Sequence, residues 1–255
     1  SRFGDGRGRE TRMNTGRVDA FWEDPEKVEE FAGKPPDHRL RALIEAEPDP
    51  RRLRALDVGC AGGRNAVFLA EHGVEVVATD GSAAMVERTR ARLAALLGPE
   101  LAAERVIRAT MDAMPWAADA SFELVVALGI YHNARTAEEW RAALAETARV
   151  LGPGGRVLVS VFTPETDLDG QGHSPVPGIP NLFERPGGRR MYMVDPATLD
   201  RDLAAHGLEP VEPTALAEGQ VEVGRRVSAN GLYRKRSIAR PVSVANGAIP
   251  PQPEE

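Results

Sequence analysis

The sequence predicts a doubly wound α/β domain, in which helices cover both faces of a mostly parallel sheet. Short apolar segments alternate with helical segments between residues 53 and 162, as parallel strands joined by helical crossovers require. A glycine-rich turn, residues 59–63, follows the first of these strands and opens a helix. An acidic residue, Asp80, closes the next strand. Both features lie where an open α/β sheet binds its ligands, at the carboxyl ends of the strands.

Two helices are expected before this alternation, and together they form a helical cap over residues 17–50. Phe21, Val28 and Phe31 recur at roughly helical spacing, and the prolines at 35 and 36 separate this helix from the next. Residues 1–16, rich in glycine and arginine, are expected to form a disordered leader.

The alternation itself contains five strands and three helices. Ser82 and Thr136 are the expected N-caps of two of these helices. The strands are expected at residues 53–58, 74–79, 105–109, 122–128 and 156–162, and the helices at residues 64–72, 82–97 and 136–151.

The pattern changes after residue 163. Residues 164–190 are rich in proline and glycine and lack periodicity, which predicts a structureless acceptor loop or lid. A short strand at 192–194, a helix at 196–206 with Asp195 as its N-cap, and late strands near 208–216 and 227–233 are expected to follow. The folded domain therefore spans residues 17–236, and residues 237–255 are expected to form a disordered tail.

The composition is that of an ordinary globular protein, and it disfavours several partners. The formal net charge of −6 argues against nucleic acid, because proteins that bind phosphate backbones usually carry a basic excess. The single cysteine, Cys60, excludes an intramolecular disulfide and favours a cytoplasmic location. No apolar run is long enough to span a bilayer, so no membrane partner is expected. The protein is expected to be a monomer or a homodimer.

The glycine-rich turn is open to two interpretations. A dinucleotide fingerprint requires glycines at the spacing G-x-G-x-x-G, but here Ala61 takes the second position and Arg64 the third. An arginine where the helix must pack closely against the strand argues against that fingerprint. A carboxylate such as Asp80 can accept hydrogen bonds from ribose hydroxyls in either interpretation.

Three segments resemble the class I S-adenosylmethionine-dependent methyltransferases. Residues 57–65 (Asp-Val-Gly-Cys-Ala-Gly-Gly-Arg-Asn) resemble motif I of that family, an acidic residue followed by G-x-G-x-G, with Ala61 replacing the middle glycine. Residues 111–116 with 120–126, and residues 146–155, are similar to two later elements of the same family in the same order. The resemblance covers residues 53–163.

The resemblance implies a seven-stranded, Rossmann-like sheet with an antiparallel last strand, and S-adenosyl-L-methionine as cofactor. It places Asp57 near the ammonium group, Asp80 at the ribose and Asp112 at the adenine amine. Trp116 is expected to pack against the sheet edge rather than to stack on adenine. The expected cofactor-binding residues are Asp57, Gly59, Cys60, Ala61, Gly63, Asn65, Asp80, Gly81, Met111, Asp112, Ala113, Leu128 and Gly129.

Two histidines are candidates for the proton transfer that many O-methyltransferases need. His132 follows the fourth strand, whose carboxyl end borders the transferable methyl in this family, and is expected to be a general base. A loop histidine that binds backbone groups is the alternative. His173, in the 164–190 loop, is a second candidate as acid/base or metal ligand. No ordered His/Asp cluster compels a metal, so none is expected. Cys60 is expected to be a small buried residue, not a nucleophile.

The expected activity is methylation of a small-molecule acceptor, such as an O-methylation of a sugar or other secondary metabolite in bacterial biosynthesis. RNA and protein methyltransferases remain alternatives, as does a non-catalytic regulator that binds S-adenosylmethionine, or an NAD-dependent enzyme. The sequence does not identify the acceptor or the atom that is methylated.

Overall fold

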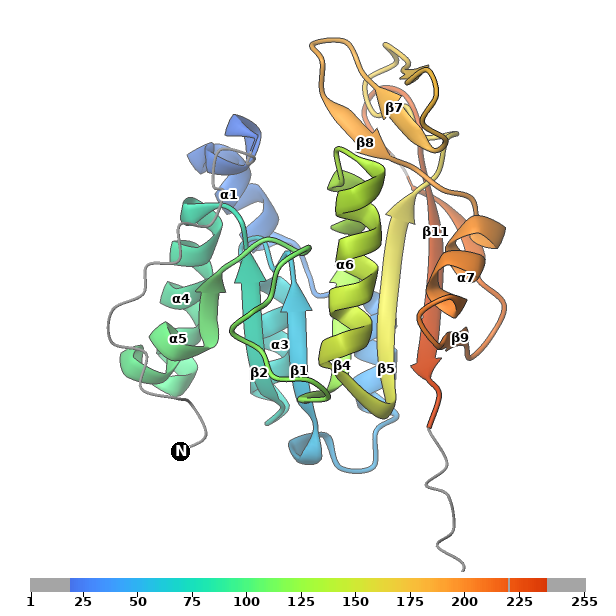
Figure 1. Ribbon diagram of the computed structural model, residues 1–255. Helices are drawn as coiled ribbons and strands as arrows, with labels where there is room; N and C mark the ends of the chain where they lie inside the picture. The colour runs from blue at the N-terminus through green and yellow to red at the C-terminus, as the bar shows by residue number, and fades with distance from the viewer. Residues whose placement is uncertain (1–18, 220, 238–255) are drawn as a thin grey trace, which may run out of the picture.

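The computed structural model describes residues 19–219 and 221–237 and contains a main sheet of eight strands (Figure 1). The strand order is β10-β11-β5-β4-β1-β2-β3, with the short strand β9 also paired to β11. The five strands from β3 to β5 are parallel, whereas β11 runs antiparallel to β5 and to both β9 and β10. The strands are β1 (Arg54–Val58), β2 (Glu75–Asp80), β3 (Val106–Arg108), β4 (Phe122–Leu128), β5 (Leu151–Phe162), β9 (Leu208–Pro210), β10 (Ala215–Gly219) and β11 (Arg226–Lys235).

This order confirms the predicted Rossmann-like sheet with an antiparallel last strand. Strand β9 is one more than the predicted seven, because the single strand expected at 208–216 is divided into β9 and β10. The predicted leader, and the predicted tail apart from Ser237, lie outside the described residues.

Helices cover both faces of the sheet, because successive strand residues point to opposite sides. Val125 and Ala127 of β4 belong to one apolar cluster, and Leu124 and Val126 to the other. The first cluster includes residues of α6 and α7, and the second includes residues of α2, α3, α4 and α5. The helices are α1 (Pro25–Gly33), α2 (His38–Glu45), α3 (Arg64–Glu71), α4 (Ala83–Leu97), α5 (Pro99–Arg105), α6 (Ala137–Val150) and α7 (Pro196–Ala204).

The predicted caps are confirmed. The side chains of Ser82, Thr136 and Asp195 accept hydrogen bonds from the amides of the first turns of α4, α6 and α7. Helix α5 was not predicted; it begins with Pro99 at its first turn, directly after the end of α4.

The prediction of a structureless segment at 164–190 was wrong. Residues 164–194, called the lobe below, contain a three-stranded antiparallel sheet of β6 (Ser174–Pro175), β7 (Leu182–Glu184) and β8 (Arg190–Tyr192). These strands are too short to show a period of two in the sequence. The lobe is anchored to the core where the Tyr192 ring stacks on Trp140 of α6 at 4.8 Å.

The carboxyl ends of the parallel strands meet at one edge, which is the upper edge in Figure 1. The α1 segment and the β7–β8 hairpin stand on opposite sides of that edge. Within the described residues, no helix combines the length and apolarity that crossing a membrane would take.

Candidate active site

The glycine-rich turn after β1 is shaped by residues in the left-handed region. Gly59, Ala61 and Gly63 have φ values of 71°, 49° and 81°. Gly59 is further constrained, because a Cβ atom there would lie 2.6 Å from Cδ1 of Ile130. The Gly59 amide donates to the carbonyl of Thr79 at 2.8 Å, which fixes the turn to β2. Alanine at position 61 therefore leaves the turn intact, as the sequence predicted.

Asp57 is a buried carboxylate next to this turn. It is 2% exposed, and its Oδ2 has no hydrogen-bond partner among the described residues. Burial raises the pKa of Asp57 to about 7; the nearby Arg64 opposes this shift and Asp80 adds to it. A buried carboxylate oxygen without a hydrogen-bond partner destabilises the protein when no ligand is bound. A cationic ligand group would supply the missing partner.

Asp80 ends β2 and links the turn to helix α4. Its Oδ2 accepts from the Ala61 amide and its Oδ1 from the Ser82 amide, both at 2.9 Å. Burial raises the pKa of Asp80 to about 6, although these donors favour the ionised form. Because β1 and β2 are adjacent and parallel, Asp57 and Asp80 lie at neighbouring strand ends.

The loop that contains Met111, Asp112 and Ala113 begins beside Asp80. The Ala109 amide donates to the Asp80 carbonyl at 3.0 Å, so the loop leaves β3 at the ligand-binding edge. Trp116, further along, packs edge-on against Phe122 with 6.4 Å between ring centroids. Its partial burial against the core supports the predicted packing role.

Three other predicted residues have partners within the protein. Cys60 is buried, and burial raises the pKa of its thiol well above the ordinary value, which fits an unreactive residue. The Oδ1 of Asn65 accepts from the Asp37 amide at 3.0 Å and so ties the N-terminal cap to α3. The Gly81 carbonyl accepts from Arg108 Nε at 3.0 Å. The contact of Asn65 with the cofactor stays a prediction.

The end of β4 packs directly on the glycine-rich turn. Gly129, with a φ of 82°, donates its amide to the Ser160 carbonyl at 2.9 Å and turns the chain out of the sheet after Leu128. The side chain of Ile130 then contacts Gly59. Leu128 and Gly129 therefore lie beside the turn, as expected for the cofactor site.

His132 lies in the short 3-10 helix η4 (Tyr131–Asn133) and is only 4% exposed. Its ring stacks on Phe162 at 3.8 Å, and its Nδ1 accepts from the Phe162 amide at 3.3 Å. Burial, together with the charge of Arg189, lowers the pKa of His132 to about 3. The ring is thus neutral, with its proton on Nε2, and these contacts fit a hydrogen-bond donor better than the predicted general base.

His173 belongs to the lobe. It lies just before β6 and packs edge-on against Phe183 of β7, with 4.9 Å between the rings. No cluster of three or more His, Cys, Asp or Glu side chains in the described part of the chain is arranged to hold a metal ion. The acid/base role of His173 stays a prediction.

The N-terminal cap closes over the β2–α4 corner. The hydroxyl of Ser82 donates to the Trp22 carbonyl at 2.8 Å. The Glu23 carboxylate accepts from the amides of Ala83 and Ala84 at 2.9 and 3.1 Å, at the N-terminus of α4. Both Trp22 and Glu23 lie in the 3-10 helix η2 (Ala20–Glu23). The sequence suggested a cap here but gave no sign of these two contacts.

Comparisons with known proteins identify the family. A family profile described as a methyltransferase domain matches residues 55–155. A demethylmenaquinone methyltransferase from Clavibacter sepedonicus is 30% identical over 193 residues, which cover 71% of this chain and 75% of the relative. The chain belongs to the class I S-adenosylmethionine-dependent methyltransferases.

Two further similarities support this assignment. A malonyl-[acyl-carrier protein] O-methyltransferase from Halorhodospira halophila is 31% identical over 64% of this methyltransferase and 52% of its own length. In fold, the methyltransferase is similar to 1,6-didemethyltoxoflavin-N1-methyltransferase from Burkholderia thailandensis, solved with S-adenosylhomocysteine. That similarity has a TM-score of 0.61, 21% identity and coverage of 88% of each chain.

The residues present fit S-adenosylmethionine, the cofactor of this methyltransferase family. The open Oδ2 of Asp57 suits the ammonium group of the cofactor, and the two-oxygen end of Asp80 suits its ribose hydroxyls. We propose these roles together with the predicted contribution of Asp112 to adenine binding.

Proposed function

We propose that this methyltransferase transfers a methyl group to a small-molecule acceptor held between the N-terminal cap and the lobe, residues 164–194. We further propose that an oxygen atom of a sugar or other secondary metabolite receives the methyl. A cytoplasmic location is part of the proposal, supported by the single buried Cys60.

The observation that carries this proposal is a contact between the cap and the lobe across the ligand-binding edge. Asp19, at the start of the cap, forms an ion pair with Arg189 of the β7–β8 hairpin, with 3.4 Å between Oδ2 and Nε. Two segments that meet over the strand ends suit an enclosed small molecule better than RNA or a folded protein, which need an open face. The acidic net charge of −6 also argues against RNA.

The chemistry requires positioning more than reactive side chains. When bound, S-adenosylmethionine supplies an activated methyl on a sulfonium, which passes to the acceptor by in-line displacement. Asp57 would hold the ammonium group and Asp80 the ribose of the cofactor, and the Gly59 turn would let the backbone approach it. The cap and the lobe would exclude water and align the acceptor. The proton that an acceptor hydroxyl loses would go to solvent or to a base, for which His173 and His132 are the predicted candidates.

The relatives support a small acceptor without deciding the atom. By name, one acts on demethylmenaquinone and another is an O-methyltransferase of a malonyl group on a carrier protein. The O-methyltransferase relative is the support for oxygen as the receiving atom.

The test is a mass-spectrometric screen of hydroxylated metabolites and sugar derivatives with S-adenosylmethionine, in which methylated product and S-adenosylhomocysteine are measured together. We expect equal amounts of both with at least one small acceptor, and no product with the Asp80→Ala variant at low cofactor concentration. Intact cofactor binding with no turnover of any small molecule would favour the non-catalytic regulator, and methylation of RNA or protein would overturn the proposal.

A further inference from the structure

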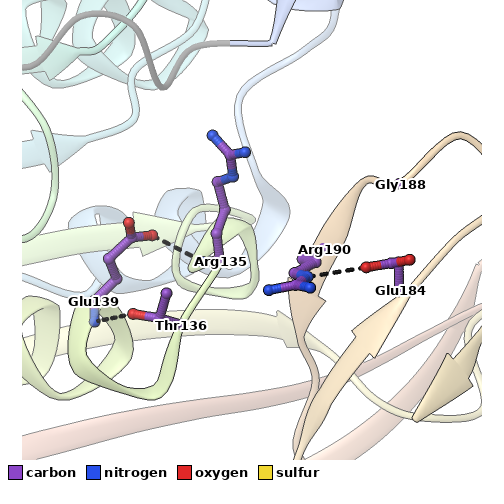
Figure 2. A pocket seen from close by; sticks show the side chains of 6 residues that line it. All are labelled: Arg135, Thr136, Glu139, Glu184, Gly188 and Arg190. Atoms are coloured by element: carbon purple, nitrogen blue, oxygen red, sulfur yellow. Dashed lines mark hydrogen bonds and ion pairs between the residues drawn. The ribbon is translucent and has the colours of Figure 1, made fainter. Parts of the chain in front are cut away.

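Several arginines surround the β7–β8 hairpin, and most of them have carboxylate partners. Arg190 pairs with Glu184 at 2.9 Å, and Arg185 pairs with Asp169. Arg190 and Arg135 lie on the two sides of an open hollow between the hairpin and the start of α6 (Figure 2). The hollow has a volume of about 350 Å³. Glu184 and Glu139 line the same hollow, so its charge is balanced and it indicates no anion site.

Arg189 is partly buried, as Arg185 is, but it differs from these neighbours in its contacts. Its side chain is 30% exposed, and its Nη2 donates to Asn133 Oδ1 at 3.2 Å. Its carboxylate partner is Asp19, which lies 3.4 Å from Nε and is itself 40% exposed. A guanidinium has five N–H donors, and these two contacts use few of them. Burial lowers the pKa of Arg189; the charge of Asp19 opposes this shift and that of Arg185 adds to it.

Two independent chains of contacts place Arg189 over the ligand-binding edge. On one side, the Asn133 amide group donates to the carbonyls of Gly129 and Ile130 at 3.2 and 3.1 Å. Ile130 in turn contacts Gly59 of the glycine-rich turn. Arg189 is therefore connected through Asn133 and Ile130 to the turn that precedes α3.

On the other side, Asp19 is fixed to the cap. Its Oδ1 accepts from the Phe21 amide at 3.0 Å at the start of η2. The same short helix contacts Ser82, two residues beyond Asp80, through the Trp22 carbonyl. The Arg189 guanidinium thus lies between the β1 and β4 ends and the cap, at the mouth of the crevice where an α/β sheet binds its ligands.

We propose that Arg189 is a specificity-determining residue of this methyltransferase, and that it binds a carboxylate group of the acceptor in place of Asp19. This inference rests on the proposed small-molecule activity and names the chemical class of the acceptor. The site already accepts a carboxylate, that of Asp19, which acts as an internal substitute while the acceptor is absent. A planar guanidinium matches a carboxylate through two parallel hydrogen bonds, so lysine would replace it poorly.

Binding of simple probes tests the proposal directly. The protein is saturated with S-adenosylhomocysteine and titrated with benzoate or malonate, and with the uncharged benzamide or malonamide as matched controls. The readout is the NMR signal of the arginine Nε–H groups. We expect the carboxylates, but not the amides, to bind saturably and to shift the Arg189 signal.

Four variants distinguish binding by Arg189 from the general charge of the hairpin. Arg189→Gln should weaken carboxylate binding by about tenfold or more, and Arg189→Lys should restore only part of it. Arg190→Gln, which removes a neighbouring arginine already paired with Glu184, should bind as the wild type does. Asp19→Asn keeps a good cap residue but removes the competing charge, so it should bind carboxylates about threefold to tenfold more tightly.

The outcomes are distinct. Carboxylate binding that is equal in the wild type and Arg189→Gln, binding of the amides equal to that of the acids, absence of any carboxylate binding, or weaker binding by Asp19→Asn would each overturn the proposal. If the metabolite screen finds acceptors that are all neutral and are turned over equally by Arg189→Gln, the role of Arg189 fails while the small-molecule activity stands. If no acceptor is turned over although carboxylates bind at Arg189, the proposed function fails instead.

Discussion

The proposed cofactor side and the proposed acceptor side of the ligand-binding edge differ in charge and in construction. The proposed cofactor side carries two carboxylates, the buried Asp57 and the partly buried Asp80, whose pKa values desolvation raises to about 7 and about 6. The acceptor side carries the half-buried guanidinium of Arg189. The two carboxylates lie at the ends of two successive strands, β1 and β2, whereas Arg189 meets Asp19 and Asn133, which come from distant segments.

Because the two sides carry opposite charges, each is expected to bind one of the two ligands, and a change on one side should leave the other ligand's affinity unaltered. The carboxylates favour the positive charges of S-adenosylmethionine, and the guanidinium favours an anion. The turn of Gly129 and Ile130 lies between the two carboxylates and the guanidinium. Ile130 contacts Gly59 on one side, and its carbonyl accepts from Asn133 on the other. Each of the following predictions changes one side and leaves the other as a reference.

The largest effect is expected for Asp57→Asn. In the cofactor-free protein the folded pKa of about 7 lies above the ordinary value of 3.8, so the native state binds the extra proton between these values. The stabilising contribution is therefore complete below about pH 4 and is lost as the pH rises through 7. Asparagine does not ionise, so the variant does not lose this stability as the pH rises. At pH 8 its free energy of unfolding should exceed that of the wild type by up to about 4 kcal/mol.

Thermal unfolding at pH 5 and pH 8 measures this gain, which should appear mainly at pH 8. Calorimetry should show the opposite effect on the cofactor, whose affinity should fall about 10-fold to 100-fold. For the wild type, cofactor affinity should rise with pH through 6 to 7 as Asp80 and Asp57 ionise. An Asp57→Asn protein with wild-type cofactor affinity would remove Asp57 from the site.

His132→Ala should lower the free energy of unfolding by about 2–4 kcal/mol, because it deletes a buried ring that stacks on Phe162 and accepts from its amide. Turnover per folded molecule should change by less than about tenfold, and its pH profile should show no imidazole titration near 6.5. A loss of about 10²–10⁴-fold in a well-folded variant would instead restore the general-base role that the sequence predicted.

Asp80→Ala should weaken cofactor binding by about 1–3 kcal/mol, the usual range for charge-assisted hydrogen bonds. The substitution would also remove the hydrogen bonds that the Ala61 and Ser82 amides donate to the Asp80 carboxylate, so the turn should become more mobile. Calorimetry with S-adenosylhomocysteine measures the affinity, and carboxylate binding at Arg189 serves as the reference that should not change. Unaltered cofactor affinity would exclude Asp80.

The smallest effect is expected for Glu23→Gln. Its carboxylate lies at the N-terminus of α4, an exposed position where a negative charge stabilises by about 0.3–1 kcal/mol. The variant should melt slightly earlier at low salt, and the difference should shrink at high salt. A salt-independent difference would show that the lost interaction is steric rather than electrostatic.

The sequence by itself determined the parts of this protein that depend on local physics. Alternating apolar segments and the caps Ser82, Thr136 and Asp195 set the strands and helices of the main sheet. The turn after β1 needs residues that tolerate positive φ, so its motif was visible in the chain. Asp57 and Asp80 could be predicted to lie near each other because they are at the ends of neighbouring strands, and parallel strands end at one edge.

Only the tertiary structure decided the features that depend on partners far apart in sequence. The lobe has a sheet because its short strands pair with each other and pack on α6, which no local period reveals. Burial lowers the pKa of His132 to about 3 and so makes its imidazole a weak base, although its chain position suggested a general base. Residues 185–190 include three arginines, but only the fold placed Arg189 beside Asp19 and Asn133. Burial and long-range pairing, which set the charge state of each group, are properties of the packed chain and not of any short segment of it.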